Sequence, residues 1–471
     1  LRSRQASALG ERACIHAVPF PPHAAMISCA RQKRAPFPMS PNLLYIFADQ
    51  LNGFSIGCNG NPDARTPHLD ALAARGTVMQ NAFSCAPVCT PARITMWTGR
   101  YAGNLGTLAN DARIPTGIPT MADTFRNAGY LTSYVGKWHI GGTGNVPVAE
   151  HLRGGFEAFA GFQCYNEFRK DVRFFDDHNQ PLEFPGRHRT DATFDLAIER
   201  LRAAAQGDRP FLLCVSEQAP HYPCQPSEEF LASFRGCHMS VRPKVVLGID
   251  PYTPTYSPPS PPKAEDPTFK AYGGDMQEYL RHYHAAVSQV DAGVGRLLTE
   301  LEKLGIAENT IVIFSSDHGD MQGSHGLTNK CVPYEESVRI PFLAAGPGIA
   351  KGAVCEDPIG TVDFFPTFTE LCGLSIPPGL AGHSMADAIF GRKFGTSERV
   401  FSEDQSGWAM VREGAWKLVS DLRADEPKQL FSLERDPFEM ENLLRNPETS
   451  AVRDRLAEAL RVWRRQNPLA Q

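Results

Sequence analysis

The chain has 471 residues, with 47 Lys and Arg and 52 Asp and Glu side chains that give a net charge of −5. Hydrophobic residues make up 42% and charged residues 21%, as in a globular protein long enough to bury a large core. No apolar run approaches the roughly 18–20 residues of a membrane span, and the mild acidity argues against a nucleic-acid carrier. What remains is a chain of two or three domains, or one large α/β domain with an appendage.

Residues 1–38 differ from the rest in charge. They hold one acid, Glu11, and six basic residues: Arg2, Arg4, Arg12, Arg31, Lys33 and Arg34. An Arg-rich, acid-poor start is typical of a transit segment, but no apolar run of signal-peptide length is present. The alternative, which we favour, is a natural start at Met39, because a predicted strand begins directly after it. We expect residues 1–38 to be a basic leader that is disordered or non-native, and the protein to be cytoplasmic if Met39 is the start.

Four short apolar runs predict the strands of a parallel sheet, and they span residues 42–48, 131–135, 211–216 and 310–315. Helices are expected between them. Thr66-Pro67 is typical of a helix start, a second helix spans residues 120–128, and apolar residues recur every three or four positions from Met276 to Leu304. This alternation predicts an α/β fold, in which a large mixed, mostly parallel sheet has helices on both faces.

The rhythm changes after about residue 390. Short strands are expected at residues 400–403, 408–412 and 416–420 and a helix at 449–465. We therefore expect a catalytic α/β domain over residues 39–390 and a smaller α+β subdomain with a short antiparallel sheet over 391–471. Residues 251–267 hold seven prolines and predict an extended surface loop.

Chemistry-bearing residues follow two of the predicted strands. Asp49 follows the first strand, and the pair Asp317-His318 follows the strand at 310–315. Ligands gather beyond the carboxyl ends of the strands in such sheets. The sequence therefore predicts that these side chains meet at one site.

The segment from Cys85 to Arg100 is the most informative in the chain. Pro91 suits the first turn of a helix and places Cys89 at its start, where free N–H groups and the helix dipole favour an anion or a thiolate. The alternative from local physics alone is a disulfide between Cys85 and Cys89, or plain packing.

Several motifs resemble those of the type I sulfatases of the alkaline phosphatase superfamily. The family's maturation signature, Cys-x-Pro-x-Arg-x-x-x-x-Thr-Gly, is intact from Cys89 to Gly99. Further similar stretches are GYLTSYVGKWH at 129–139, SSDHGD at 315–320, WKL at 416–418 and LFSLERDP at 430–437. Their common order makes the disulfide alternative the weaker one.

The resemblance implies that a separate maturation system oxidises Cys89 to Cα-formylglycine, with Arg93 bracing it. The hydrated aldehyde is a geminal diol: one hydroxyl attacks sulfur and the alcohol leaves, then the second hydroxyl collapses to the aldehyde and expels sulfate. An ordinary Ser or Cys lacks that second hydroxyl, which gives the modification its purpose.

The resemblance also implies one divalent metal. Its ligands would be Asp49, Gln50, Asp317 and His318, joined by a formylglycine oxygen at Cys89. Oxygen-rich ligation favours calcium. Gln50 replaces the second Asp of the commonest family pattern, which removes one negative charge, and His318 keeps manganese open as the alternative.

The other catalytic and substrate-binding residues that the resemblance implies are Arg93, Asn110, Lys137, His139, His221 and Lys330. Lys137 would contact the sulfate and the diol, and His139 would position or deprotonate a hydroxyl. Asn110 would contact the sulfate. His221 and Lys330 would lie near the leaving oxygen, and either one is a candidate general acid.

Three hypotheses follow. The first is a sulfatase acting on a small-molecule or carbohydrate sulfate ester, such as an aryl sulfate, a sulfated sugar or choline sulfate, without nucleic-acid partner or membrane span and with the oligomeric state open. The second is a phosphonate monoester or phosphodiester hydrolase on the same scaffold, although that relative carries Tyr and Thr where this chain has Lys137 and His139. The third is a non-catalytic protein that binds sulfated glycans.

Overall fold

The computed structural model describes residues 40–242, 271–392, 395 and 398–470. These residues belong to one structural unit, Pro36–Gln471. The predicted leader at 1–38 and the proline-rich segment at 251–267 lie outside the described residues. The domain boundary at residue 390 stays a prediction.

A ten-stranded sheet forms the centre, in the order β12-β2-β11-β9-β1-β8-β4-β5-β6-β7. Its middle strands, β9 to β5, run parallel, whereas β11, β6 and β7 pair antiparallel with their neighbours. The predicted mixed, mostly parallel sheet is therefore confirmed. The strands are β1 (Asn42–Asp49), β2 (Thr77–Met79), β4 (Leu131–Lys137), β5 (Ala158–Phe162), β6 (Arg173–Phe175), β7 (Pro181–Glu183), β8 (Phe211–Pro220), β9 (Thr310–Ser316), β11 (Phe342–Ala345) and β12 (Ala353–Cys355).

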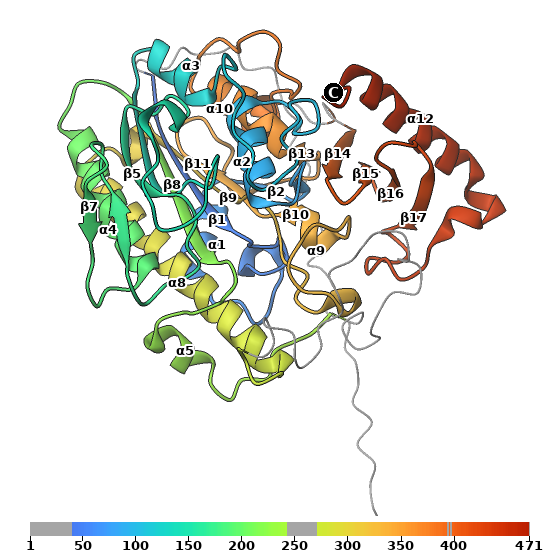
Figure 1. The fold of residues 1–471 in the computed structure, drawn as a ribbon, viewed down its shortest axis with the longest axis horizontal. Coiled ribbons are helices and arrows are strands. Elements are labelled where there is room, and N and C mark those ends of the chain that lie inside the picture. The colour runs from blue at the N-terminus through green and yellow to red at the C-terminus, as the bar shows by residue number, and fades with distance from the viewer. Residues whose placement is uncertain (1–39, 243–270, 393–394, 396–397, 471) are drawn as a thin grey trace, which may run out of the picture. The chain divides into compact units, whose positions relative to one another are not determined.

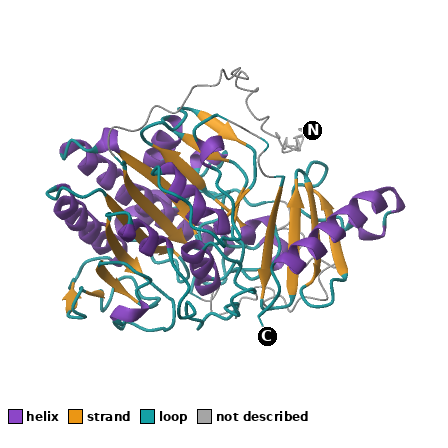
Figure 2. Cartoon of the chain, turned by 90° about the horizontal axis from the view of Figure 1, so that it is seen from above, coloured by secondary structure: helices purple, strands orange, loops and turns teal. Residues whose placement is uncertain are grey.

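Helices cover both faces of this sheet, as Figure 2 shows. Alternate residues of β1 enter two separate cores: Leu44 and Ile46 pack on one face, Tyr45 and Phe47 on the other. The first face carries α1 (Pro67–Ala74), α4 (Arg189–Ala205), α5 (Glu228–Phe234) and α8 (Met276–Lys303). The second carries α2 (Cys89–Thr98), α3 (Met121–Asn127), α10 (Phe364–Leu371) and α11 (Ala386–Ile389).

A second, four-stranded antiparallel sheet follows near the C-terminus (Figure 1). Its strands are β14 (Arg399–Asp404), β15 (Trp408–Glu413), β16 (Trp416–Asp421) and β17 (Pro427–Ser432), and α12 (Ser450–Gln466) packs against it. The predicted strands and terminal helix are thus present, with β17 in addition. A short sheet of β3 (Ala82–Phe83), β10 (Arg339–Ile340) and β13 (Ile359–Gly360) and the helix α9 (Glu335–Val338) complete these elements. No described helix is long and apolar enough to cross a membrane.

Candidate active site

The carboxyl ends of the parallel strands bring the predicted site residues together. In sheet order, β9, β1, β8 and β4 end at or just before Asp317-His318, Asp49, His221 and Lys137. Because each strand points the same way, residues far apart in sequence meet beyond one end of the sheet. The sequence prediction of a shared site at this end agrees with that arrangement.

Cys89 reaches the same place from the start of α2. Val88 before it is extended, Gly99 ends the helix with a φ of 60°, and all ten residues of α2 are buried. The Cys89 side chain faces the strand ends with 1% of the residue exposed. Cys85 and Cys89 are both free thiols, so the disulfide considered from the sequence is not formed.

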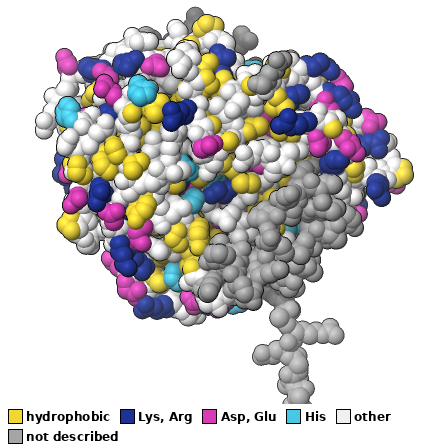
Figure 3. All heavy atoms as spheres, viewed as in Figure 1, with side chains coloured by type: hydrophobic (Ala, Val, Ile, Leu, Met, Phe, Trp, Pro, Cys, Tyr) yellow, Lys and Arg dark blue, Asp and Glu magenta, His cyan; other side chains and the backbone are white. Residues whose placement is uncertain are grey.

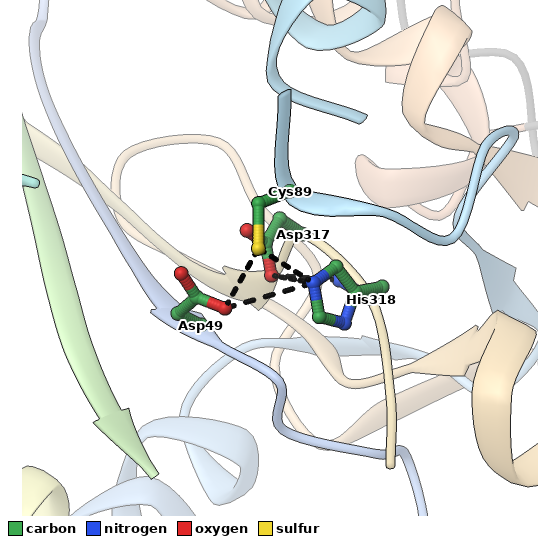
Figure 4. Close-up of side chains that lie close together, drawn as sticks. All are labelled: Asp49, Cys89, Asp317 and His318. Atoms are coloured by element: carbon green, nitrogen blue, oxygen red, sulfur yellow. Dashed lines mark hydrogen bonds and ion pairs between the residues drawn. The ribbon is translucent and has the colours of Figure 1, made fainter. Parts of the chain in front are cut away.

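The side chains of Cys89 and three metal-type residues, Asp49, Asp317 and His318, converge on one point (Figure 4). The Cys89 Sγ lies 3.6 Å from Asp49 Oδ1 and 3.2 Å from His318 Nε2. One ligand atom from each of Asp49, Cys89, Asp317 and His318 lies within 4.8 Å of the others. His318 Nδ1 lies 3.0 Å from the Gly319 carbonyl and donates its proton there, which leaves the Nε2 lone pair aimed at the cluster. This donor set suits a divalent cation.

Two buried cations neutralise the far side of the carboxylates. Arg93 Nη2 lies 3.0 Å from Asp49 Oδ2 and 3.0 Å from Asp317 Oδ2. Lys137 Nζ lies 2.6 Å from Asp49 Oδ2, and all these side chains are fully buried. The Oδ2 atoms are therefore paired with cations, whereas the Oδ1 atoms face the His318 ring. Asp317 Oδ1 also accepts from the backbone amides of Gln50 and His318 at 3.2 and 2.9 Å.

The charges around Cys89 shift its acidity. Burial alone would raise the pKa of the thiol, but the charges of Lys137 and Lys330 hold this pKa well below its ordinary value. The pKa of Asp317 is raised, first by burial and then by the charge of Asp49. A bound cation would relieve that repulsion between the two carboxylates.

His221 and Lys330 form a pair near Cys89. Lys330 Nζ lies 3.0 Å from His221 Nε2, and His221 Nδ1 lies 2.5 Å from the carbonyl of Tyr222. The ring therefore donates from Nδ1 and accepts from Lys330 at Nε2. Burial, followed by the Lys330 charge, lowers the pKa of His221 to about 4. In the space-filling view, histidine and basic side chains gather near the middle of the face shown (Figure 3).

Gln50 makes contacts that the sequence did not predict. Its backbone has a φ of 69°. Its Oε1 accepts from Lys330 Nζ at 2.6 Å, and its Nε2 donates to Asp320 and, at 3.2 Å, to Asn329 Oδ1. The role of Gln50 as a metal ligand stays a prediction.

His139 and Asn110 flank the start of α2. The Asn110 Oδ1 accepts from the Thr90 amide at 3.0 Å, and the Thr90 hydroxyl donates to the His139 carbonyl at 2.5 Å. The His139 ring interacts with the thiols of Cys89 and Cys164, and its Nδ1 has no hydrogen-bond partner among the described residues. Both side chains are therefore held next to the nucleophile position.

Sequence reasoning missed the groups behind Gln50. Asp320 lies in the SSDHGD stretch but carried no assigned role, and Asn329 precedes the predicted Lys330. Tyr279 and Tyr283 belong to the buried side of α8, yet their hydroxyls reach Asp320 Oδ1 and the Gln50 carbonyl at 2.8 and 2.7 Å. The sequence did contain one sign of these contacts: a buried tyrosine in an otherwise apolar stripe usually finds a hydrogen-bond partner for its hydroxyl.

Comparison with known protein families shows which family this chain belongs to. The family model "Sulfatase" matches residues 41–374, and the model "N-sulphoglucosamine sulphohydrolase, C-terminal" matches residues 323–466. The chain belongs to the sulfatase family. This sulfatase is thus a sulfuric ester hydrolase with a candidate metal site at the buried Cys89. The predicted family and enzyme class are confirmed.

Individual relatives agree with the family assignment. The sulfatase is 33% identical to the ulvan-active sulfatase of Formosa agariphila over 431 residues, covering 89% of this chain and 80% of that one. It is 31% identical to the choline-sulfatase of Rhizobium meliloti, covering 86% and 83%. A solved protein in complex with its substrate D-glucosamine-2-N,6-O-disulfate shares the fold with a TM-score of 0.80 at 22% identity, covering 91% and 98%.

Proposed function

We propose that this sulfatase acts through a Cα-formylglycine made from Cys89 by a separate maturation system. The observation that carries the proposal is the position of Cys89: 1% exposed, at a helix N-terminus, among Lys137, Lys330 and three metal-type donors. In the hydrated form, formylglycine supplies an attacking hydroxyl and a second hydroxyl that expels sulfate. The intact signature from Cys89 to Gly99 supports the modification.

One divalent metal, calcium, would be held by Asp49, Asp317 and His318, with the modified Cys89 completing the set. The Gln50 side-chain amide next to this set is engaged by Lys330, Asp320 and Asn329. When bound, the ion withdraws negative charge from the sulfuryl oxygens. The oxygen donors support calcium over softer ions, and manganese is the alternative because His318 offers a nitrogen.

The chain's own residues prepare the reaction around this centre. Lys137 and Asn110 bind the sulfate oxygens, and Arg93 keeps Asp49 and Asp317 fixed. His139 takes the proton of the attacking hydroxyl. Its ring lies in contact with Cys89, and its Nδ1 has no hydrogen-bond partner among the described residues.

Lys330 supplies the proton to the leaving oxygen, and His221 orients it. The supporting observation is the direction of their contact: His221 Nε2 is the acceptor and Lys330 the donor, 3.0 Å apart. Burial lowers the pKa of Lys330, but the charges of Cys89 and Asp49 raise it above its ordinary value. Converting Cys89 to a neutral aldehyde removes one of those charges and makes Lys330 a better acid.

We infer that the substrate is a sulfated carbohydrate. Buried amide oxygens of Gln163 and Gln218 have no hydrogen-bond partner among the described residues. The Gln163 backbone carbonyl accepts from the His139 backbone amide, and Gln218 lies three positions before His221 in the sequence. Sugar hydroxyls satisfy such groups. The substrates named for the ulvan-active relative and for the glucosamine disulfate complex support this class.

Mass spectrometry of the peptide that contains Cys89, from protein made in a host able to form formylglycine, tests the nucleophile. We expect an aldehyde at position 89 in active protein and no turnover in Cys89→Ala. Active protein that carries only the thiol would contradict the proposal.

A substrate panel tests the reaction. We compare kcat/KM for sulfated mono- and oligosaccharides, choline sulfate, an aryl sulfate and an aryl phosphonate, with chelated enzyme reloaded with calcium or manganese. The highest value is expected for a sulfated sugar with calcium. Preference for choline sulfate would refute the carbohydrate class, and preference for the phosphonate would favour the second hypothesis. Binding of sulfated sugar by formylglycine-bearing protein without turnover would favour the third.

A further inference from the structure

Asp320 is a fully buried carboxylate outside the cluster of metal-type donors. Within the described part of the chain, three groups donate hydrogen bonds to its two carboxylate oxygens. The Tyr279 hydroxyl and the backbone N–H of Gln322 each donate to Oδ1 at 2.8 Å. The Gln50 side chain donates from Nε2 to Oδ2. Asp320 therefore acts as an acceptor, and its Oδ2 faces the Gln50 side chain.

The Asp320 carboxylate decides which way round the Gln50 amide lies. The oxygen and nitrogen of an amide have nearly the same shape, so their partners determine the orientation. Asp320 and the Asn329 Oδ1 both accept from Nε2. With the nitrogen fixed on that side, Oε1 faces Lys330 and accepts from its ammonium at 2.6 Å. The hydroxyl of Tyr283 holds the Gln50 backbone carbonyl at 2.7 Å.

The oriented Gln50 amide in turn fixes Lys330. The ammonium lies between two acceptors, Gln50 Oε1 at 2.6 Å and His221 Nε2 at 3.0 Å. A lysine ammonium sits on a flexible four-carbon stem, so it needs such partners to stay in one place. We propose that Asp320 is a positioning residue for sulfate ester hydrolysis, because it orients the Gln50 amide that holds the Lys330 ammonium beside the leaving oxygen. This inference rests on the proposed function, in which Lys330 supplies the proton.

The variant Asp320→Asn tests the proposal. It keeps the size of the side chain but replaces one acceptor oxygen with an NH₂ group. Tyr279 and the Gln322 amide both donate to Oδ1, so the oxygen stays there and the NH₂ group faces Gln50. The Gln50 amide then reverses to accept from this new donor and turns its own NH₂ toward Lys330. We expect kcat to fall about 10²-fold for a sugar sulfate but less than about threefold for 4-nitrophenyl sulfate, because a nitrophenolate leaves without a proton.

Two further variants separate positioning from general damage. Asp291→Asn makes the same change in another buried carboxylate, which accepts from the amides of His68 and Leu69 at the start of α1. We expect it to leave the ratio of the two kcat values unchanged. Lys330→Ala should show the same substrate-selective loss as Asp320→Asn, and combining the two should cost nothing more than Lys330→Ala alone.

Each of the following results would overturn the inference. Equal losses of kcat on both sulfates, or additive losses in the double variant, would show a merely structural role. A weaker calcium affinity by calorimetry together with equal losses would place the effect at the metal. A crystal structure of Asp320→Asn in which Lys330 Nζ still donates to Gln50 Oε1 would show that Asp320 does not orient the Gln50 amide. Wild-type protein that turns over neither sulfate would refute the proposed function instead, and that crystal structure would still decide the inference.

Discussion

At the scale of single residues, Arg93 binds one oxygen of each of the two buried carboxylates, Asp49 and Asp317. Asp49 and Asp317 each turn Oδ2 toward the guanidinium at 3.0 Å. Their Oδ1 atoms lie 3.6 and 3.7 Å from His318 Nε2, on the side of the metal-type cluster. Burial would lower the pKa of Arg93, but Asp317 and Asp49 raise it, so the guanidinium stays charged. Each carboxylate therefore turns one oxygen toward Arg93 and the other toward His318.

Replacing Arg93 with Met should leave Asp317 without its arginine partner and Asp49 with Lys137 as its remaining cation. We expect the free energy of unfolding in a chelating buffer to fall by roughly 3–5 kcal/mol, measured by urea denaturation. Saturating calcium should recover part of this loss, because it supplies positive charge at the same carboxylates. Arg189→Met is the control, since buried Arg189 donates to backbone carbonyls, and calcium should not recover its loss. Equal calcium effects on both variants would contradict the prediction.

A second buried carboxyl, Glu217, gives the fold a pH dependence. It is fully buried on β8 and accepts from Thr190 Oγ1 at 2.8 Å and from the Ala219 amide at 2.9 Å. Burial raises its pKa from the ordinary 4.5 to about 7. Between these values the folded state binds more protons at Glu217 than the unfolded state does, so the contribution of Glu217 to stability falls as pH rises through this window and is level above it.

The variant Glu217→Gln should lack this slope. Between about pH 4.5 and pH 7 the wild-type chain should lose roughly 3 kcal/mol that the variant keeps, from the size of the pKa shift. Urea unfolding at about pH 5 and about pH 8 measures the difference. The same loss in both proteins would show that other groups carry the pH dependence.

At the scale of elements, the close pairing of β4 and β8 places Lys137 in the active site. Gly136 pairs with Ser216 across these strands and has a φ of 110°. A Cβ at this glycine would lie 2.0 Å from the Ser216 carbonyl oxygen, a contact that no side chain can make. The Ser216 hydroxyl also accepts from Arg93 at 2.9 Å. Glycine is therefore required where the backbone turns Lys137 into the site.

Gly136→Ala should cost about 3 kcal/mol or more of stability, because the clash with backbone cannot relax by a rotamer change. Soluble yield and melting temperature measure it. Gly129→Ala is the matched control: its φ is 88°, but nothing lies within 4 Å of the added Cβ. That variant should lose only the roughly 1–2 kcal/mol of left-handed backbone strain. Similar losses at both positions would exclude the close contact as the cause.

At the scale of the whole molecule, the four-stranded sheet takes part in the active site. Trp408 on β15 donates from Nε1 to the carbonyl of Cys331 at 3.0 Å, next to Lys330. Lys417 on β16 is fully buried and pairs with Glu335 at 2.8 Å and Glu439 at 2.6 Å. The loop that carries Lys330 is therefore held from the C-terminal side of the chain.

Trp408→Phe should loosen this loop while keeping most of the packing. We expect kcat on a sugar sulfate to fall about tenfold, since one buried hydrogen bond is worth roughly 1–1.5 kcal/mol. Trp463→Phe on α12 is the control, because its ring contacts Tyr101 and Phe401, away from Lys330. The prediction fails if both variants lose the same activity.

Much of the fold was predictable because its central strands are buried on both faces. Residues 42–48 and 310–315 lie within β1 and β9, and the apolar stripe from Met276 predicts α8. No sequence pattern predicted β5 to β7 or α4. β7 is partly exposed, with the burial pattern of an outer strand, and α4 mixes charged residues into its turns. Such elements depend on neighbours that only the folded chain supplies.

Site residues could be predicted where the sequence resembles a family motif. Cys89, Lys137 and His318 were named because they lie in such motifs. The Gln50 contacts could not be predicted, because the direction of an amide depends on partners such as Asp320 from a distant segment. No spacing in the sequence indicates which oxygen faces which nitrogen.

The burial of α2 has a consequence for timing. Every residue from Cys89 to Thr98 lies inside the folded protein, and Arg93 is tied to carboxylates from two other strand ends. Under the proposed maturation, a second enzyme that modifies Cys89 would have to bind this stretch as an open peptide, which the folded chain does not offer. Maturation and folding would then compete, and a molecule that folds first would keep its thiol. The yield of modified enzyme would depend on which of the two processes reaches Cys89 sooner.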